Sequence, residues 1–108
     1  MVKEKNKNKW RKTTNLVHEA EPRTAYGETG EALFLTSSYV YDSAEQAQAR
    51  FLGEDDGYQY SRFGNPTVRS FEKRMIAFES ADFNFETGFE IDARATATGM
   101  AAVTAAML

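Results

Sequence analysis

The chain has 108 residues, no cysteine and one histidine, and its formal net charge is −3. These numbers exclude a disulfide framework, a thiolate metal site and a cysteine nucleophile, and a single histidine (His18) does not build a zinc site. The longest apolar run is far shorter than the roughly 20 residues of a membrane span. The first residues contain no apolar signal core, so we expect a cytoplasmic protein with no membrane partner.

Residues 1–12 are basic, because they hold six of the 13 lysines and arginines of the chain. A basic tip on an acidic body can bind nucleic acid, so a small nucleic-acid-binding module is one hypothesis. However, lysine alternates with asparagine here, and Trp10 is the one aromatic side chain that could stack on a base. The composition favours a solvated, disordered tail, with no nucleic-acid partner.

Residues 13–42 contain few helix signals. Pro22, Gly27 and Gly30 interrupt a stretch of threonine, valine, tyrosine, phenylalanine and leucine, which predicts an extended, irregular arm. Such an arm has little core of its own and must pack on something else.

The first predicted helix begins after Ser43. Ser43 and Gln46 form a capping-box pair, and Gly53 ends the helix. Residues 53–57 then form a flexible acidic loop, and an extended stretch follows it.

Residues 60–67, Tyr-Ser-Arg-Phe-Gly-Asn-Pro-Thr, combine a candidate binding pair with a helix start. In an extended stretch, residues two apart point the same way, so Tyr60 and Arg62 should lie side by side. A phenol beside a guanidinium is suited to bind an oxyanion, and phosphate above all. Asn65 is a good N-cap, and Pro66 suits the first helical position because its missing N–H would have no partner there.

The second predicted helix covers residues 66–80. The side chains expected on its buried face are apolar: Val68, Phe71, Met75, Ile76 and Phe78. The side chains expected on its solvent face are charged: Arg69, Glu72, Lys73 and Glu79.

The sequence of residues 82–93 predicts a small hairpin, because apolar side chains flank the turn residues Glu86-Thr87-Gly88. It could be a surface elaboration or a subunit contact, and we favour the surface. Its apolar residues are Phe83, Phe85, Phe89 and Ile91.

A short strand over Arg94–Ala97 should lead through a glycine turn into an alanine-rich helix that begins at Gly99. Backbone N–H groups at a helix start bind anions, and a glycine lets the anion approach closely. The Thr98 hydroxyl could add a further donor. The apolar run that follows has no cap or stop signal, so we interpret the chain as a fragment cut in mid-helix.

Three motifs together resemble the cystathionine γ-synthase family of pyridoxal-phosphate (PLP) enzymes. They are Tyr60-Ser61-Arg62, Asn65-Pro66-Thr67 and Thr98-Gly99-Met100-Ala101-Ala102. The similarity runs from about Thr13 to Leu108 and corresponds to the amino-terminal quarter of the family. The family usually has serine where Thr98 stands, and threonine keeps the hydroxyl.

The resemblance implies an α/β fold, the N-terminal part of a fold-type I PLP-dependent transferase. It implies a basic tail over residues 1–12, an arm over 13–65 that contacts a neighbouring subunit, and the start of the large PLP-binding domain over 66–108. It also implies a homo-oligomer, a dimer with shared sites that pairs into a tetramer.

The resemblance further implies where the cofactor phosphate binds. Gly99 and Met100, with Thr98, hold it from one subunit, and Tyr60 and Arg62 reach it from the partner subunit. The Schiff-base lysine of the family has no counterpart in this chain, so we expect no catalytic residue and no metal ligand here.

The reaction implied is a γ-replacement on a small-molecule substrate, in which O-succinylhomoserine and sulfide give homocysteine and succinate. The alternatives within the family are the cystathionine γ-synthase, γ-lyase and methionine γ-lyase reactions.

Overall fold

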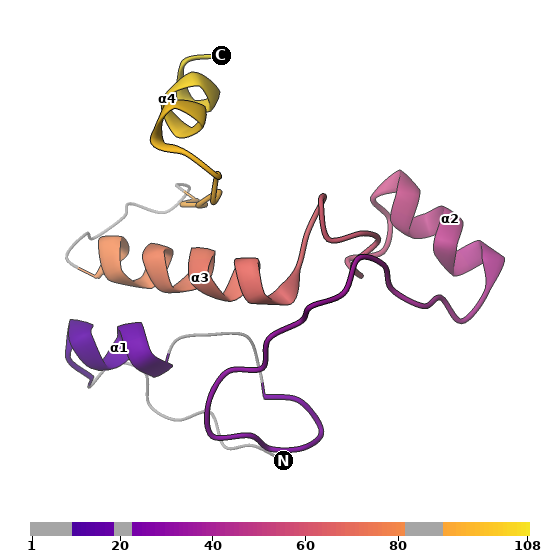
Figure 1. Ribbon diagram of the computed structural model, residues 1–108, viewed down its shortest axis with the longest axis horizontal. Helices are drawn as coiled ribbons and strands as arrows, with labels where there is room; N and C mark the ends of the chain where they lie inside the picture. The colour runs from indigo at the N-terminus through magenta and orange to yellow at the C-terminus, as the bar shows by residue number, and fades with distance from the viewer. Residues whose placement is uncertain (1–9, 19–22, 82–89) are drawn as a thin grey trace. The chain divides into compact units, whose positions relative to one another are not determined.

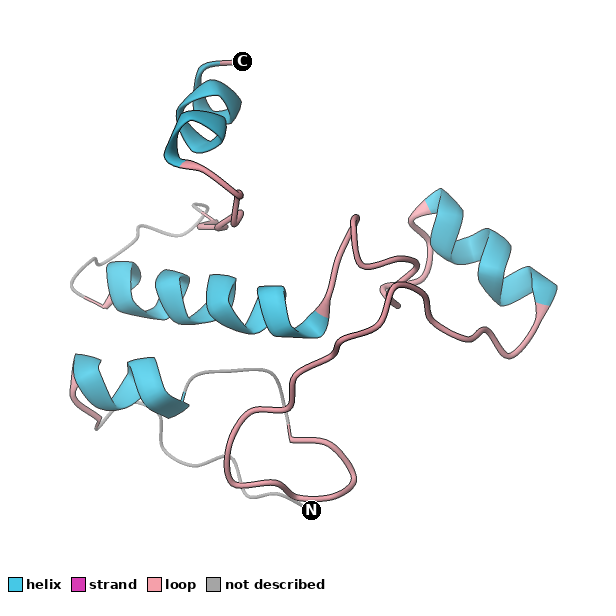
Figure 2. Cartoon of the chain, viewed as in Figure 1, coloured by secondary structure: helices cyan, strands magenta, loops and turns pink. Residues whose placement is uncertain are grey.

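The computed structural model describes residues 10–18, 23–81 and 90–108 (Figure 1). The described residues form four helices joined by loops (Figure 2): α1 (Lys12–His18), α2 (Ala44–Leu52), α3 (Pro66–Ser80) and α4 (Gly99–Met107). Their only β pairing is an isolated antiparallel bridge between Ser38 and Tyr60. The chain divides into two compact units, residues 21–69 and residues 1–20 with 70–108, and each is described by itself below.

Helix α1 corrects the prediction for the beginning of the arm. Residues 13–42 were expected to be extended, but Lys12–His18 is helical. Contacts made by side chains hold this turn of helix: the Trp10 and His18 rings lie 5.2 Å apart, and the Lys12 ammonium lies 5.7 Å from the Phe78 ring centroid. Tertiary contacts of this kind override a weak local helix propensity. The rest of the arm that the structure describes, residues 23–42, contains no helix, as predicted.

Helix α2 begins and ends at the predicted residues. The Ser43 hydroxyl oxygen accepts a hydrogen bond of 3.1 Å from the Gln46 amide, as an N-cap does. The reciprocal bond differs from a capping box, because the Gln46 side chain accepts from the Asp42 amide (2.7 Å) and not from that of Ser43. Gly53 ends the helix with a φ of 76°, a left-handed conformation that favours glycine.

The acidic loop after α2 is bound to the helix by one arginine. The Arg50 Nε donates to Asp55 Oδ1 (2.8 Å), and its Nη1 donates to the Tyr58 carbonyl oxygen (3.2 Å). The Gly57 amide donates to the same Asp55 oxygen (2.7 Å). The guanidinium also lies 5.3 Å from the Tyr41 ring centroid. A loop that was predicted to be flexible is therefore attached to α2 at several points.

This attachment should depend on pH. The hydrogen bond from Arg50 and that from the Gly57 amide lower the pKa of the Asp55 carboxyl below its ordinary value of 3.8. A carboxyl with a lower pKa in the folded state stabilises that state above its unfolded pKa, and the contribution is lost as pH falls through the folded pKa. We therefore expect the loop to loosen only below pH 3.8. Carboxyl-carbon NMR of aspartate-labelled protein measures this directly, and an Asp55 that titrates at or above its ordinary pKa would contradict it.

Asn65 joins the arm to α3. Its Oδ1 accepts from the Thr67 amide (2.8 Å), which confirms the predicted N-cap, and α3 begins at Pro66 as predicted. Its Nδ2 donates to the Phe34 carbonyl oxygen and to the Ser61 Oγ, each at 2.9 Å. The side chain is buried, with 7% exposure, and it is hydrogen-bonded both to the arm and to the first turn of α3.

Asn65→Ala should lower the free energy of unfolding by about 2–4 kcal/mol. Loss of an N-cap costs about 1 kcal/mol, and each hydrogen bond lost from a buried group costs about 1 kcal/mol more. Asn65→Asp keeps the capping oxygen but cannot donate, so its loss should be smaller. Urea unfolding of the complete protein would measure both, and equal losses would mean that the cap contributes nothing.

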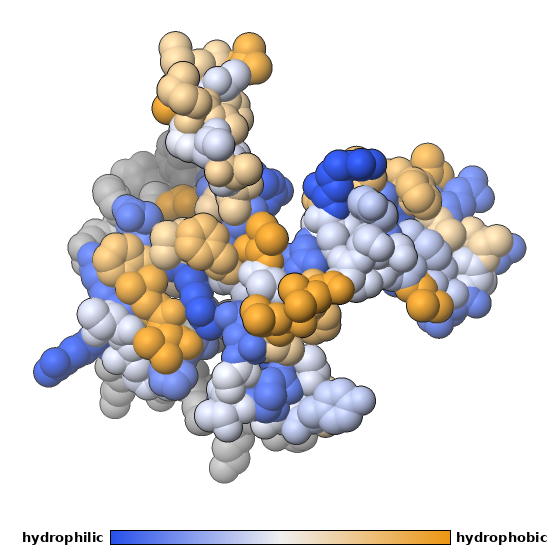
Figure 3. Space-filling model, in the orientation of Figure 1, coloured by the Kyte–Doolittle hydropathy of each residue, from blue (hydrophilic) through white to orange (hydrophobic). Residues whose placement is uncertain are grey.

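The fully buried residues of α3 are polar, which corrects the prediction in part: Met75, Ile76 and Phe78 are half-buried, but Val68 and Phe71 are exposed. Ser70 and Glu72 are 1% and 6% exposed, whereas Phe71 is 54% exposed. Glu72 was expected to face solvent. In the part of the chain that the structure describes, no hydrophobic side chain is buried, and Figure 3 shows hydrophobic residues at the surface. Glu72 is buried because backbone and side-chain groups of residues 94–95 satisfy its carboxylate.

The strand predicted over Arg94–Ala97 does not form. These residues have no paired strand, because the Ala95 amide donates to Glu72 and not to a neighbouring strand. The predicted hairpin lies mostly outside the described residues, at 82–89, and residues 90–93 are in no strand. The described residues thus show the α part of the expected α/β fold and no sheet.

Candidate phosphate-binding site

The Tyr60–Arg62 segment is a turn and not the extended stretch that was predicted. Tyr60 forms the bridge to Ser38, and the chain then reverses. The amides of Phe63 and Gly64 both donate to the Tyr60 carbonyl oxygen, at 2.9 and 3.1 Å. Alternation along a strand therefore cannot bring Tyr60 and Arg62 together.

The turn itself brings the two side chains together. The Arg62 guanidinium lies 5.2 Å from the Tyr60 ring centroid and 5.4 Å from that of Phe63, so it is held by cation–π contacts. Among the described residues, Arg62 forms no ion pair and donates no hydrogen bond. The guanidinium is therefore positioned by aromatic rings, with its N–H groups available to a ligand.

Ser61 supports this turn, and the sequence analysis did not single it out. Its hydroxyl donates to the Thr36 carbonyl oxygen and accepts from the Asn65 Nδ2. The Tyr39 hydroxyl lies 3.4 Å from the same oxygen. A serine between two expected binding residues was the available signal, but two of its partners, Thr36 and Tyr39, are more than 20 residues away in the sequence.

The start of α4 has the donors expected of an anion site. The Thr98 Oγ1 accepts from the Ala101 amide (3.1 Å), so Thr98 is the N-cap. Its O–H remains able to donate, because this bond uses only a lone pair. Among the described residues, the amides of Gly99 and Met100 donate to no acceptor. Free amides at the start of a helix attract a negative charge.

The backbone conformation at Gly99 does not require a glycine. Its φ is not positive, in contrast to those of Gly27 and Gly53, so the turn does not require glycine. A Cβ built at Gly99 would meet nothing within 4 Å. A glycine at this position leaves open space beside the backbone, which is the space that a bound anion would need.

Each of the two segments, taken by itself, offers donors that suit a phosphate group. Thr98 to Met100 offer a hydroxyl and two backbone N–H groups, and Tyr60 and Arg62 offer a phenol and a guanidinium. The two segments belong to different units. In the described ranges, no three histidine, aspartate or glutamate side chains group as a metal site would require. No helix among these residues is long and apolar enough to cross a membrane.

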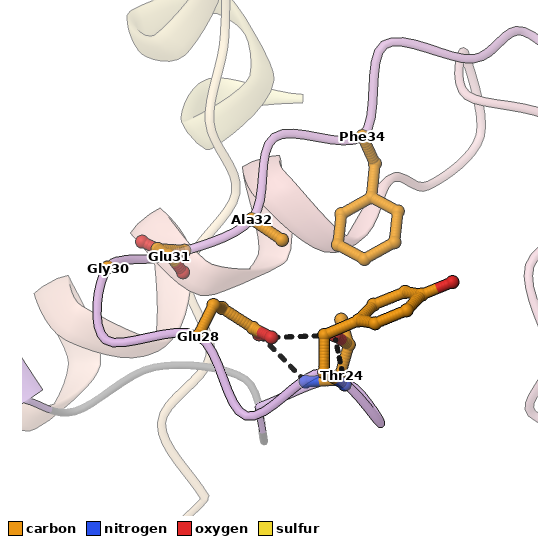
Figure 4. Close-up of a pocket in the computed structure, with 7 residues that line it drawn as sticks. Thr24, Glu28, Gly30, Glu31, Ala32 and Phe34 are labelled. Carbon is orange, nitrogen blue, oxygen red and sulfur yellow. Dashed lines mark hydrogen bonds between the residues drawn. The ribbon is translucent and has the colours of Figure 1, made fainter.

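A hollow of about 530 Å³ lies along the arm, lined by residues between Thr24 and Phe34 (Figure 4). The Thr24 amide and hydroxyl donate to the two carboxylate oxygens of Glu28, at 2.7 and 2.6 Å. These bonds, that of the hydroxyl foremost, lower the pKa of Glu28. Because these two residues satisfy each other, we assign no ligand to the hollow.

Comparison with known proteins identifies the class. The model of the Cys/Met metabolism PLP-dependent enzyme family matches residues 12–108. The chain belongs to this family of PLP-dependent enzymes, which confirms the resemblance seen in the motifs. Membership implies the fold-type I architecture and favours the enzyme hypothesis over a small binding module.

Individual relatives are consistent with this family. The chain is 48% identical over 95 residues to O-succinylhomoserine sulfhydrylase of Pseudomonas aeruginosa, covering 88% of this chain and 21% of the relative. It is 51% identical over 81 residues to the Mycobacterium tuberculosis protein of the same name, covering 75% and 18%. It is 33% identical over 94 residues to L-methionine gamma-lyase of Fusobacterium nucleatum, covering 87% and 22%. The chain thus spans about a fifth of the length of these relatives.

Proposed function

We propose that the complete protein is a PLP-dependent enzyme that replaces the succinyl group of O-succinylhomoserine with sulfide, giving homocysteine and succinate. The observation that carries this proposal is the identity of 48% and 51% to two sulfhydrylases, against 33% to a methionine gamma-lyase. The donors at the start of α4 and at the Tyr60 turn support the cofactor part of it.

In this proposal, the chain holds the cofactor by its phosphate. The amides of Gly99 and Met100 and the Thr98 hydroxyl bind the phosphate of their own subunit. Tyr60 and Arg62 bind the phosphate of the partner subunit, with the guanidinium oriented by its cation–π contacts. The bound cofactor supplies an electron sink that lets protons leave the substrate carbons.

The proposal extends to the domain organisation, the oligomeric state and the cellular location of the complete protein. Residues 13–65 contact a neighbouring subunit, and residues 66–108 begin the large PLP-binding domain. Residues 1–12 form a tail. The protein is a homo-oligomer, a dimer with shared sites that pairs into a tetramer, and it works in the cytoplasm on a small-molecule substrate.

Activity of the complete protein tests the proposal. O-succinylhomoserine with sulfide should give homocysteine faster than the same ester with cysteine gives cystathionine. Methionine alone should release methanethiol only slowly. A preference for cysteine would instead make the protein a cystathionine γ-synthase, and rapid release of methanethiol would make it a methionine γ-lyase.

A further inference from the structure

Glu72 is a buried acid with a directed contact. It is 6% exposed, and its Oε1 accepts a hydrogen bond of 2.8 Å from the Ala95 amide. Its Oε2 lies 3.7 Å from the Arg94 Nη1. Burying a carboxylate costs free energy unless its oxygens are bonded, so these contacts are what allow Glu72 to lie inside.

These two contacts of Glu72 differ in strength. The Arg94 side chain is 70% exposed, and its Nη2 lies closer to Asp92 (2.8 Å) than its Nη1 lies to Glu72. An exposed pair at such a distance contributes little. The Ala95 bond is short, and a charged acceptor makes it about twice as strong as a neutral one. Of these two contacts, the hydrogen bond to the Ala95 backbone is therefore the stronger.

Ala95 lies four residues before Gly99, in the segment that leads into α4. The segment between them is bonded internally: the Thr96 hydroxyl donates to the Thr98 carbonyl oxygen (2.9 Å), and Thr98 caps the helix. These residues form no sheet ladder, and the Glu72 bond is a direct link between their backbone and α3 just before the cap.

We propose that Glu72 is a positioning residue for the cofactor phosphate. Through the Ala95 amide it fixes the backbone that aims the Gly99 and Met100 N–H groups. This inference rests on the proposed use of the α4 start as a phosphate site. It assigns to Glu72 a role in selecting ligands that carry a phosphate, although Glu72 touches no ligand itself.

The test compares two ligands on the complete enzyme stripped of its cofactor. Pyridoxal 5'-phosphate and pyridoxal differ only in the phosphate. Phosphate recognition is therefore measured by the dissociation constant of pyridoxal divided by that of pyridoxal 5'-phosphate. Absorbance titration gives both constants without an activity assay. In Glu72→Ala this ratio should fall about 10-fold, because pyridoxal binding should change little. Glu72→Gln keeps an oxygen for the Ala95 amide and should stay within about threefold of the wild type.

Glu79→Ala is the matched control, because Glu79 is an exposed acid on the same helix, and its ratio should not change. If Glu72→Ala does not fold, Ala95→Pro removes the donor of the same bond and should lower the ratio likewise. Equal weakening of both ligands in the folded variants would overturn the inference and leave Glu72 a structural residue. If the wild-type enzyme itself binds pyridoxal 5'-phosphate no better than pyridoxal, it is the proposed phosphate site that fails.

Discussion

Arg62→Ala in the complete protein is expected to weaken cofactor binding by about 10- to 100-fold. A hydrogen bond from a charged donor contributes roughly 1.5–3 kcal/mol, and about 1.4 kcal/mol corresponds to a tenfold change in affinity. Among the described residues the guanidinium has no competing ion pair, so its loss should act on the ligand more than on the fold. Arg23→Ala, at an exposed arginine of the arm, is the control and should leave the affinity unchanged.

Mixed dimers show which subunit Arg62 serves. The proposal places Arg62 and the Schiff-base lysine of one site on different chains. An Arg62→Ala chain paired with a chain that lacks the lysine should therefore have one doubly damaged site and one intact site. Each mutant homodimer should be weak or inactive, while the hybrid regains up to half of the activity per dimer. Confirmed hybrids without recovery would show that Arg62 serves its own subunit or none.

Gly99→Val is expected to weaken cofactor binding strongly, by at least tenfold, with little effect on folding. A side chain at this position meets no atom of the chain within 4 Å, and no positive φ opposes it. The branched side chain would instead occupy the space where a phosphate approaches the α4 amides. Titration of the cofactor and thermal unfolding without cofactor together measure the two effects.

Gly30→Val is a matched control for this substitution. A Cβ built at Gly30 also meets nothing within 4 Å, and the φ of Gly30 is not positive. Gly30 therefore has the same backbone freedom as Gly99, but it does not lie at a helix start. It should leave the cofactor affinity unchanged. Unchanged affinity in Gly99→Val would mean that the start of α4 is only structural.

Local signals predicted the helix boundaries well. Ser43 and Gly53 bound α2, Asn65 caps α3, and α4 begins at Gly99, as the sequence indicated. Caps depend on side chains that bond to the backbone two or three residues away, so a single sequence contains all the partners involved.

Distant contacts explain two of the errors. Glu72 has the spacing of a solvent-facing residue, but it bonds to the chain segment 23 residues later and is buried. The extended Tyr60–Arg62 stretch was wrong because Phe63 and Gly64 close a turn there. Helix α1 depends partly on Phe78, far along the chain. For Glu72 and α1, a contact distant in the sequence decided the conformation, whereas the turn at Tyr60 is closed by local bonds and was misread as a strand.

The polar interior of the described residues has a consequence for the heat capacity. Asn65, Ser70 and Glu72 are buried, and no hydrophobic side chain among the described residues is. The heat capacity of unfolding rises with newly exposed apolar surface and falls with newly exposed polar surface. Unfolding of these residues should therefore add little to the heat capacity of unfolding. The temperature dependence of their stability should follow directed hydrogen bonds more than the release of water from apolar groups.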